Sequence, residues 1–103
     1  MRIMVFGAGA IGSLFGGLLS RNNDVTLVGR KAHVEAIRRK GLRLTGEVDD
    51  VVYPDAVCDV SEVDEELDLV LITVKAYDTE AAAEAVKRVA GEKTLVLSLQ
   101  NGL

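Results

Sequence analysis

A G-x-G-x-x-G motif, residues 7–12, lies close to the start of the chain. It follows a short apolar run, 1–6, and opens a stretch whose apolar residues recur every three or four positions, as on one helix face. In that context Gly7 turns the chain out of a strand, Gly9 lets a pyrophosphate approach the backbone, and Gly12 lets the helix lie close to the sheet. The exposed N–H groups and the helix dipole attract phosphates. The motif predicts a dinucleotide-binding turn, and the alternative is a tight strand-to-helix turn without a ligand.

Basic residues follow the second predicted strand, where a domain that prefers NAD carries an acid. In NAD-binding domains a carboxylate about 20 residues past the glycines holds the adenosine ribose. Here that position reads Val28-Gly29-Arg30-Lys31. A guanidinium clamps the extra phosphate of NADP, which a carboxylate would repel. Arg30 therefore favours NADP over NAD, unless both basic residues are solvated surface charges.

These residues must be positioned by alternating strands and helices. We predict strands at 1–6, 24–29, 68–74 and 94–99, helices at 10–21, 31–40 and 79–89, an irregular strand pair or hairpin excursion at 42–60, and a short acidic helix or loop at 61–67. The first helix is expected to end at Asn22 and Asn23 in a left-handed conformation, and the other two at Gly41 and Gly91. The alternation predicts one α/β domain, 1–103, with a Rossmann-like doubly wound parallel sheet.

The composition excludes several classes of protein. A net charge of −4 is wrong for a non-specific nucleic-acid binder. No segment reaches the roughly 18 apolar residues of a membrane span, and nothing resembles a signal peptide, so a cytoplasmic location is expected. One cysteine builds no disulfide or thiolate metal site. The acidic stretch 59–68 lacks a compact ligand pattern and is interpreted as a solvated face, so no metal is predicted.

The pattern of elements stops early. No helix follows the strand at 94–99, whereas a complete doubly wound domain has about six strands. We therefore expect a sheet truncated after about five strands. The last strands would expose apolar surface that helices normally cover, which favours a homo-oligomer or association with a missing C-terminal domain.

Four segments carry a resemblance to a known family, in this order: MRIMVFGAGAIGSLFG, VTLVGR, DLVLITVKAYDT and LSLQNGL. With them, the whole chain resembles the N-terminal domain of the ketopantoate reductase (2-dehydropantoate 2-reductase) family. Enzymes of that family reduce ketopantoate to pantoate with NADPH in pantothenate biosynthesis. The resemblance implies an NADP-dependent oxidoreductase that acts on a 2-keto or 2-hydroxy acid. It also implies a helical C-terminal domain that supplies the catalytic lysine and most substrate contacts, so no catalytic residue is assigned to this chain and the chain alone is expected to be inactive.

The resemblance also implies roles for individual residues. The phosphate loop would consist of Gly7, Ala8, Gly9, Ala10, Ile11 and Gly12. Arg30 would hold the 2′-phosphate, Lys75 would lie over the cofactor site, and Asn101 would lie at the nicotinamide end and touch cofactor or substrate. The alternatives without a ligand are an exposed loop at Lys75 and a hairpin turn at Asn101-Gly102.

Two other functions are compatible with these motifs. A non-catalytic nucleotide-sensing module would carry a similar glycine loop. A related reductase of another 2-keto acid would share the whole pattern, because specificity resides in the second domain.

Overall fold

The computed structural model describes residues 1–7, 10–44, 50–63, 66–73 and 79–99. Within them the strands are β1 Arg2–Phe6, β2 Asp24–Val28, β3 Leu42–Leu44, β4 Asp50–Val52, β5 Asp55–Val57, β6 Leu69–Ile72 and β7 Leu95–Ser98. The helices are α1 Ala10–Leu19, α2 Lys31–Lys40 and α3 Thr79–Lys87, with a 3₁₀ turn, η1, at Val60–Glu62. The predicted alternation of strand and helix is confirmed.

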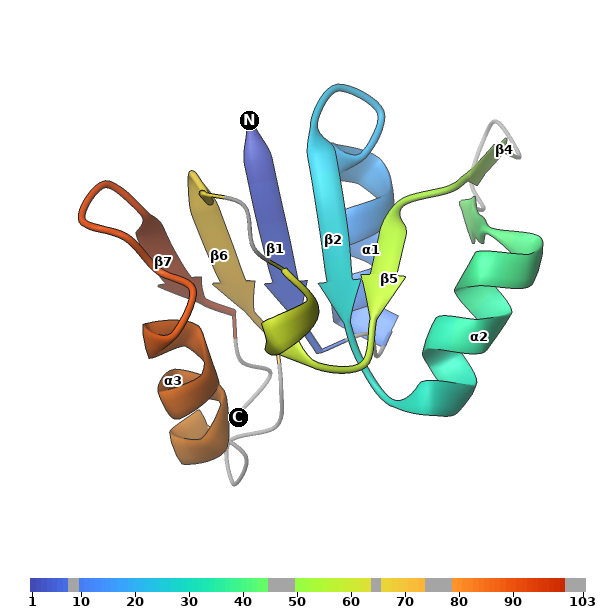
Figure 1. Cartoon of the computed structure of the whole chain (residues 1–103). Coiled ribbons are helices and arrows are strands. Elements are labelled where there is room, and N and C mark those ends of the chain that lie inside the picture. The colour runs from blue at the N-terminus through green and yellow to red at the C-terminus, as the bar shows by residue number, and fades with distance from the viewer. Residues whose placement is uncertain (8–9, 45–49, 64–65, 74–78, 100–103) are drawn as a thin grey trace.

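Five strands form one parallel sheet in the order β5–β2–β1–β6–β7 (Figure 1). From the central strand β1 the chain first moves outward to β2 and β5. It then crosses back to β6 and continues to β7 on the other side. This order is that of a Rossmann-like doubly wound α/β fold, as the sequence predicted.

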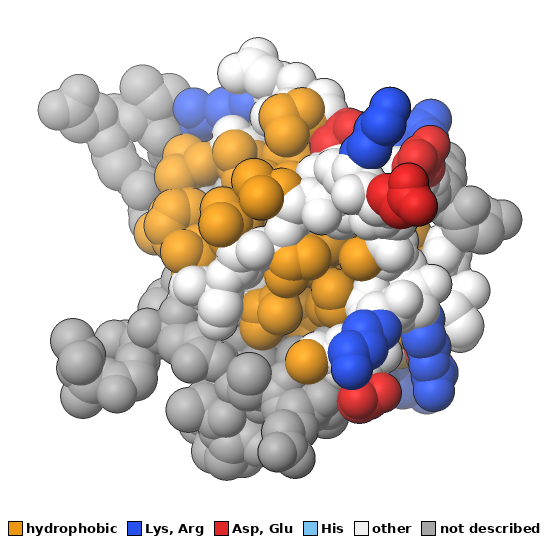
Figure 2. Space-filling model, turned by 90° about the vertical axis from the view of Figure 1, so that its left-hand side faces the viewer, with side chains coloured by type: hydrophobic (Ala, Val, Ile, Leu, Met, Phe, Trp, Pro, Cys, Tyr) orange, Lys and Arg blue, Asp and Glu red, His pale blue; other side chains and the backbone are white. Residues whose placement is uncertain are grey.

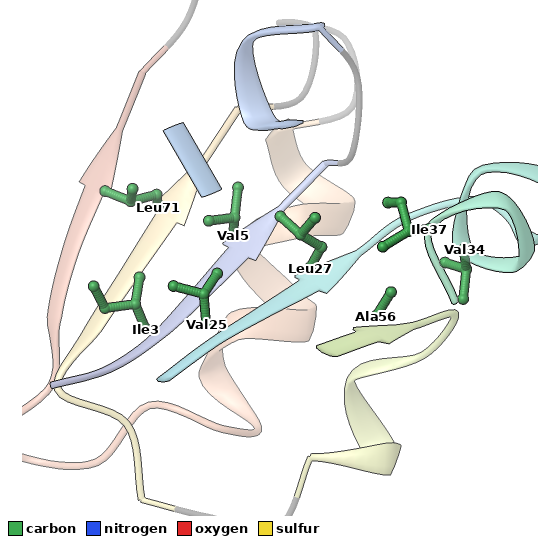
Figure 3. Close-up of a cluster of buried hydrophobic side chains, with 8 residues drawn as sticks. All are labelled: Ile3, Val5, Val25, Leu27, Val34, Ile37, Ala56 and Leu71. Carbon is green, nitrogen blue, oxygen red and sulfur yellow. The ribbon is translucent and has the colours of Figure 1, made fainter. Parts of the chain in front are cut away.

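Helices cover both faces of the sheet, and each face has its own apolar core. On one face, side chains of β1 and β2 pack with Val34 and Ile37 of α2 (Figure 3). On the other, Met4 and Val70 pack with Val60 of η1 and Val86 of α3. The central strands are apolar on both sides because both sides are covered.

Helix α2 shows how the local sequence sets its bounds. Its last turn carries Arg38, Arg39 and Lys40, which suit the negative end of the helix dipole. Gly41 then has a φ of 74°, which disfavours residues with a side chain, and its N–H donates to the carbonyl of Ile37 at 2.8 Å. The predicted helix end at Gly41 is confirmed.

The excursion at 42–60 was predicted only in part. Strands β3 and β4 form the expected antiparallel pair. Strand β5, Asp55–Val57, which begins after Tyr53 and Pro54, instead joins the main sheet in parallel beside β2. The carbonyl of Ala56 in β5 accepts a hydrogen bond of 2.9 Å from Nε of Arg38, which anchors this edge strand to α2. Three residues are too short a run for periodicity to identify.

Two smaller expectations were wrong, and both concern helix ends. Helix α1 ends at Leu19, before the asparagines. No left-handed asparagine ends it, because no described residue except glycine has a positive φ. Nδ2 of Asn23 instead donates a hydrogen bond of 3.1 Å to the carbonyl of Leu19. Helix α3 ends at Lys87, before Gly91. The described acids of the stretch 59–68 are exposed, as expected of a solvated face. Some of them also have a structural role, because Asp59 forms a capping box with Glu62 at η1 and Asp68 accepts the N–H of Arg2.

The edge strand β7 is apolar but exposed. Leu95, Val96 and Leu97 are 58%, 41% and 44% exposed, and Figure 2 shows hydrophobic side chains gathered on this side of the molecule. Leu97 pairs in register with Leu71, which belongs to the core on the face of α2. That face therefore continues onto β7 without a helix from the described residues over it. None of the described helices has the length and apolar character to cross a membrane.

Candidate nucleotide-binding site

The candidate site lies at the carboxyl ends of the parallel strands. Gly7 follows β1, Gly29 and Arg30 follow β2, and Thr73 follows β6. Strands β1 and β6 are neighbours from which the chain departs in opposite directions. In open α/β sheets the crevice at such a switch point is where ligands bind.

Gly7 is fixed among the ends of three strands. Its N–H donates to the carbonyl of Val28 in β2 at 2.8 Å, and its own carbonyl accepts the hydroxyl of Thr73 at 2.8 Å. Its φ of 112° lies in a region that residues with a Cβ rarely adopt. The sharp turn expected of Gly7 is thus confirmed, and glycine is needed there for conformational reasons.

Gly12 brings α1 against this turn. A Cβ built on Gly12 would overlap the carbonyl oxygen of Gly7 and would lie 2.7 Å from Oγ1 of Thr73. One turn later, a Cβ on Gly16 would meet the side chain of Leu27 in β2. The close helix–sheet approach expected of Gly12 is confirmed, and Gly16, which the motif did not include, continues it.

Arg30 occupies the N-cap position of α2. Its backbone is extended, with φ −72° and ψ 153°, and its side chain makes no capping hydrogen bond. The residue is exposed, and the first turn of α2 contains no acid. A cation at a helix N-terminus is unfavourable against the dipole unless an anion is near, so this placement suits a bound phosphate.

The remaining predicted residues can be located only in part. Ala10 and Ile11 are the first two residues of α1. Ala8, Gly9, Lys75 and Asn101 lie outside the described residues. Their assignments stay predictions.

Thr73 was missed by the sequence analysis, although its hydroxyl donates to the carbonyl of Gly7, the first residue of the glycine motif, and lies where a Cβ on Gly12 would meet it. A polar residue at the end of an apolar strand, one position before the quoted Val74-Lys75, was the only available signal. No group of three or more His, Cys, Asp and Glu that could hold a metal ion occurs in the part of the chain that the structure describes.

Comparison with known proteins identifies this arrangement. Residues 3–103 match the family model "Ketopantoate reductase PanE/ApbA". The chain is 44% identical to a 2-dehydropantoate 2-reductase of Pyrococcus abyssi over its full length. It superimposes on a PanE/ApbA family ketopantoate reductase from Ralstonia eutropha JMP134 with a TM-score of 0.90 and 45% identity, over 99% of its length. A ternary structure of D-mandelate dehydrogenase with NADH and anilino(oxo)acetate gives 0.86 and 33% over the whole chain.

The similarity covers only part of each relative. The chain spans 34% of the Pyrococcus protein, 35% of the Ralstonia chain and 34% of the mandelate dehydrogenase chain. The family model matches residues 3–103, and the superposition on the Ralstonia structure covers 99% of the chain. The chain belongs to the ketopantoate reductase PanE/ApbA family.

Proposed function

We propose that this chain is the NADP-binding domain, residues 1–103, of a reductase that converts 2-dehydropantoate to its 2-hydroxy acid. The observation that carries the proposal is the turn at the switch point, where Gly7 adopts a positive φ and Gly12 leaves no room for a Cβ. A reductase family with this fold implies a nicotinamide cofactor. When bound, that cofactor supplies hydride to the keto carbon of the substrate.

The described residues fit such a cofactor. The glycine turn precedes α1, whose N-terminal N–H groups and dipole favour a pyrophosphate. Arg30 follows the neighbouring strand β2, on the side where the adenosine ribose of a dinucleotide is expected. The role of Gly7, Ala8, Gly9, Ala10, Ile11 and Gly12 is to bind the phosphates.

The choice of NADP rests on Arg30. Its guanidinium presents paired donors for a 2′-phosphate, and no carboxylate occupies the first turn of α2 to repel that phosphate. Lys75 is proposed to lie over the cofactor, and Asn101 to contact nicotinamide or substrate.

Two alternative functions can be distinguished from this proposal. The ternary structure of the D-mandelate dehydrogenase relative contains NADH, which favours a related 2-keto acid reductase with the other cofactor as the second candidate. A nucleotide-sensing module is the third, and it would bind without turnover.

A second, helical domain would protonate the substrate oxygen, so no catalytic residue is assigned among these 103. We expect the chain alone, given NADPH and 2-dehydropantoate, to show no turnover in a spectrophotometric assay. Turnover in the usual enzymatic range, about 1 to 1,000 per second, would contradict this assignment.

The test of the cofactor assignment is calorimetric titration with NADPH, NADH, adenosine 2′,5′-bisphosphate and 5′-AMP. Arg30→Ala removes charge-assisted hydrogen bonds, each worth about 1.5–3 kcal/mol, and should weaken NADPH and the bisphosphate about 10- to 100-fold. NADH and 5′-AMP should bind the variant and the wild type equally.

Arg39→Ala is the matched control, because Arg39 lies in the last turn of the same helix. It should leave all four affinities unchanged. Equal wild-type affinity for NADPH and NADH, insensitive to Arg30, would remove the NADP assignment and favour the NADH-dependent candidate. Absence of binding by any of the four nucleotides would contradict the proposed function of this domain.

The apolar surface of β7 is the proposed contact with the rest of the protein. Leu95 and Leu97 extend the core face of α2 onto β7, where no described helix lies over it. The relatives are about three times as long as this chain. In a sample that contains only these 103 residues, we propose that a second copy covers this surface.

A further inference from the structure

The hydroxyl of Thr73 joins the ends of β1 and β6. The Thr73 N–H donates to the carbonyl of Phe6 at 2.9 Å, which continues the ladder of the sheet by one residue. Its Oγ1 lies 2.8 Å from the carbonyl oxygen of Gly7 and 3.2 Å from that of Phe6. Thr73 is half-buried, so these protein acceptors are the relevant partners of its hydroxyl.

The hydroxyl proton is best assigned to Gly7. A hydroxyl has one proton and can donate one strong hydrogen bond. The carbonyl of Phe6 already accepts the backbone N–H of Thr73, and it is the more distant acceptor. The Gly7 carbonyl is closer and lies in the range typical of O–H···O bonds. The side chain therefore restrains the peptide that leaves β1.

This restraint is coupled to the position of α1. The carbonyl oxygen of Gly7 and Oγ1 of Thr73 are the two atoms nearest to a Cβ built on Gly12. Gly7 is also held from the other side, by its N–H bond to Val28. The first residue of the motif is thus fixed at both its N–H and its carbonyl, next to the last residue of the motif.

We propose that Thr73 is a positioning residue for the nucleotide, which acts through Gly7 without touching the ligand. The inference rests on the proposed function. Its hydroxyl holds Gly7 in the positive-φ conformation before the ligand arrives, with α1 seated against it. Preorganisation of this kind raises affinity, because ordering of the loop is not subtracted from the binding free energy.

The hydroxyl can be removed with little change in shape. Thr73→Val replaces it by a methyl group and leaves the Gly7 carbonyl without its donor. We expect NADPH and adenosine 2′,5′-bisphosphate to bind about 5- to 20-fold more weakly, the range for one lost hydrogen bond. Thr73→Ser retains the hydroxyl and should bind within about twofold of the wild type.

Thr94→Val is the matched control. Oγ1 of Thr94 also donates to a backbone carbonyl, that of Leu67, at 2.6 Å, but at the amino end of the sheet, just before β6. It should lower the melting temperature and leave nucleotide affinity unchanged. A purely structural role for Thr73 would instead make Thr73→Val resemble Thr94→Val in both measurements.

The outcomes separate this inference from the proposed function. Wild-type affinity in Thr73→Val overturns the inference alone, whereas absence of binding by the wild type overturns both. If Thr73→Val does not fold, the comparison of Thr73→Ser with Thr73→Ala replaces it, since these two differ only in the hydroxyl. Weaker binding by the alanine variant supports the inference, and equal binding by the two overturns it.

Discussion

The two ends of the sheet use similar residues for different purposes. At the amino ends the polar groups join neighbouring strands: the Arg2 N–H donates to Oδ2 of Asp68 at 2.8 Å, and Thr94 donates to Leu67. At the carboxyl ends the polar group constrains a turn instead. The hydroxyl of Thr73 donates to the carbonyl of Gly7, which has a positive φ, and Gly12 packs so close to that carbonyl that a Cβ would not fit. An open polar hollow, lined in part by Arg2, also lies at the amino ends. Among the described residues, the backbone constraint at Gly7 and the open hollow thus lie at opposite ends of the sheet, and the proposed nucleotide site is the constrained end.

The largest effect should come from filling the space at Gly12. In Gly12→Ala the new methyl group overlaps the Gly7 carbonyl, so either α1 or the turn must shift. Overpacking of this kind costs about 1–3 kcal/mol, and we expect NADPH affinity to fall about 10- to 100-fold, as measured by calorimetry. The same substitution at Gly91, where the nearest atom would be 3.7 Å away, should change neither stability nor affinity. Equal losses of NADPH affinity in Gly12→Ala and Gly91→Ala would contradict the claim that only the carboxyl end of the sheet binds the nucleotide.

An intermediate effect, on stability alone, is expected at the amino end. Oγ1 of Thr94 accepts the Gly91 N–H at 2.9 Å as well as donating to Leu67. Thr94→Val should therefore cost about 1 kcal/mol, or about 4–8 °C in melting temperature. Thermal unfolding monitored by circular dichroism measures this. A loss of nucleotide affinity in the folded variant would show that the two ends are coupled.

The last effect is expected at β7, away from the glycine turn, and concerns self-association rather than nucleotide binding. Leu97→Lys places a charge on the exposed apolar face and should shift a self-associating wild type toward monomer in sedimentation velocity, with NADPH affinity unchanged. Ala36→Lys, which adds the same charge on the exposed side of α2, should leave association unaltered. A wild type that is sharply monomeric at all concentrations would contradict the proposed contact through β7.

The sequence was sufficient for most of the framework, because its signals are local. Short runs of apolar residues identified β1, β2, β6 and β7, and the glycine motif located the turn between β1 and α1. Gly41 ended α2 as expected, since its positive φ follows from the chemistry of glycine. These features depend on residues close together in the chain.

What the sequence did not predict depends on contacts between distant segments. Strand β5 has three residues and is defined by its pairing with β2. Thr73 and Gly7 are 66 positions apart and meet only because β1 and β6 are neighbours in the sheet. Asn23 could have formed the left-handed turn that the sequence favours, but it bonds the carbonyl of Leu19 instead.

The most direct test of the account is an NMR titration of the ¹⁵N-labelled chain with NADPH. We predict chemical-shift changes at the amides of Gly7, Gly12, Thr73 and Lys31, all near the carboxyl ends of the strands. The amides of Arg2, Gly91 and Thr94 should not move. Changes confined to the amino-end hollow, or no changes at saturating NADPH, would contradict the claim that the glycine turn is the nucleotide site.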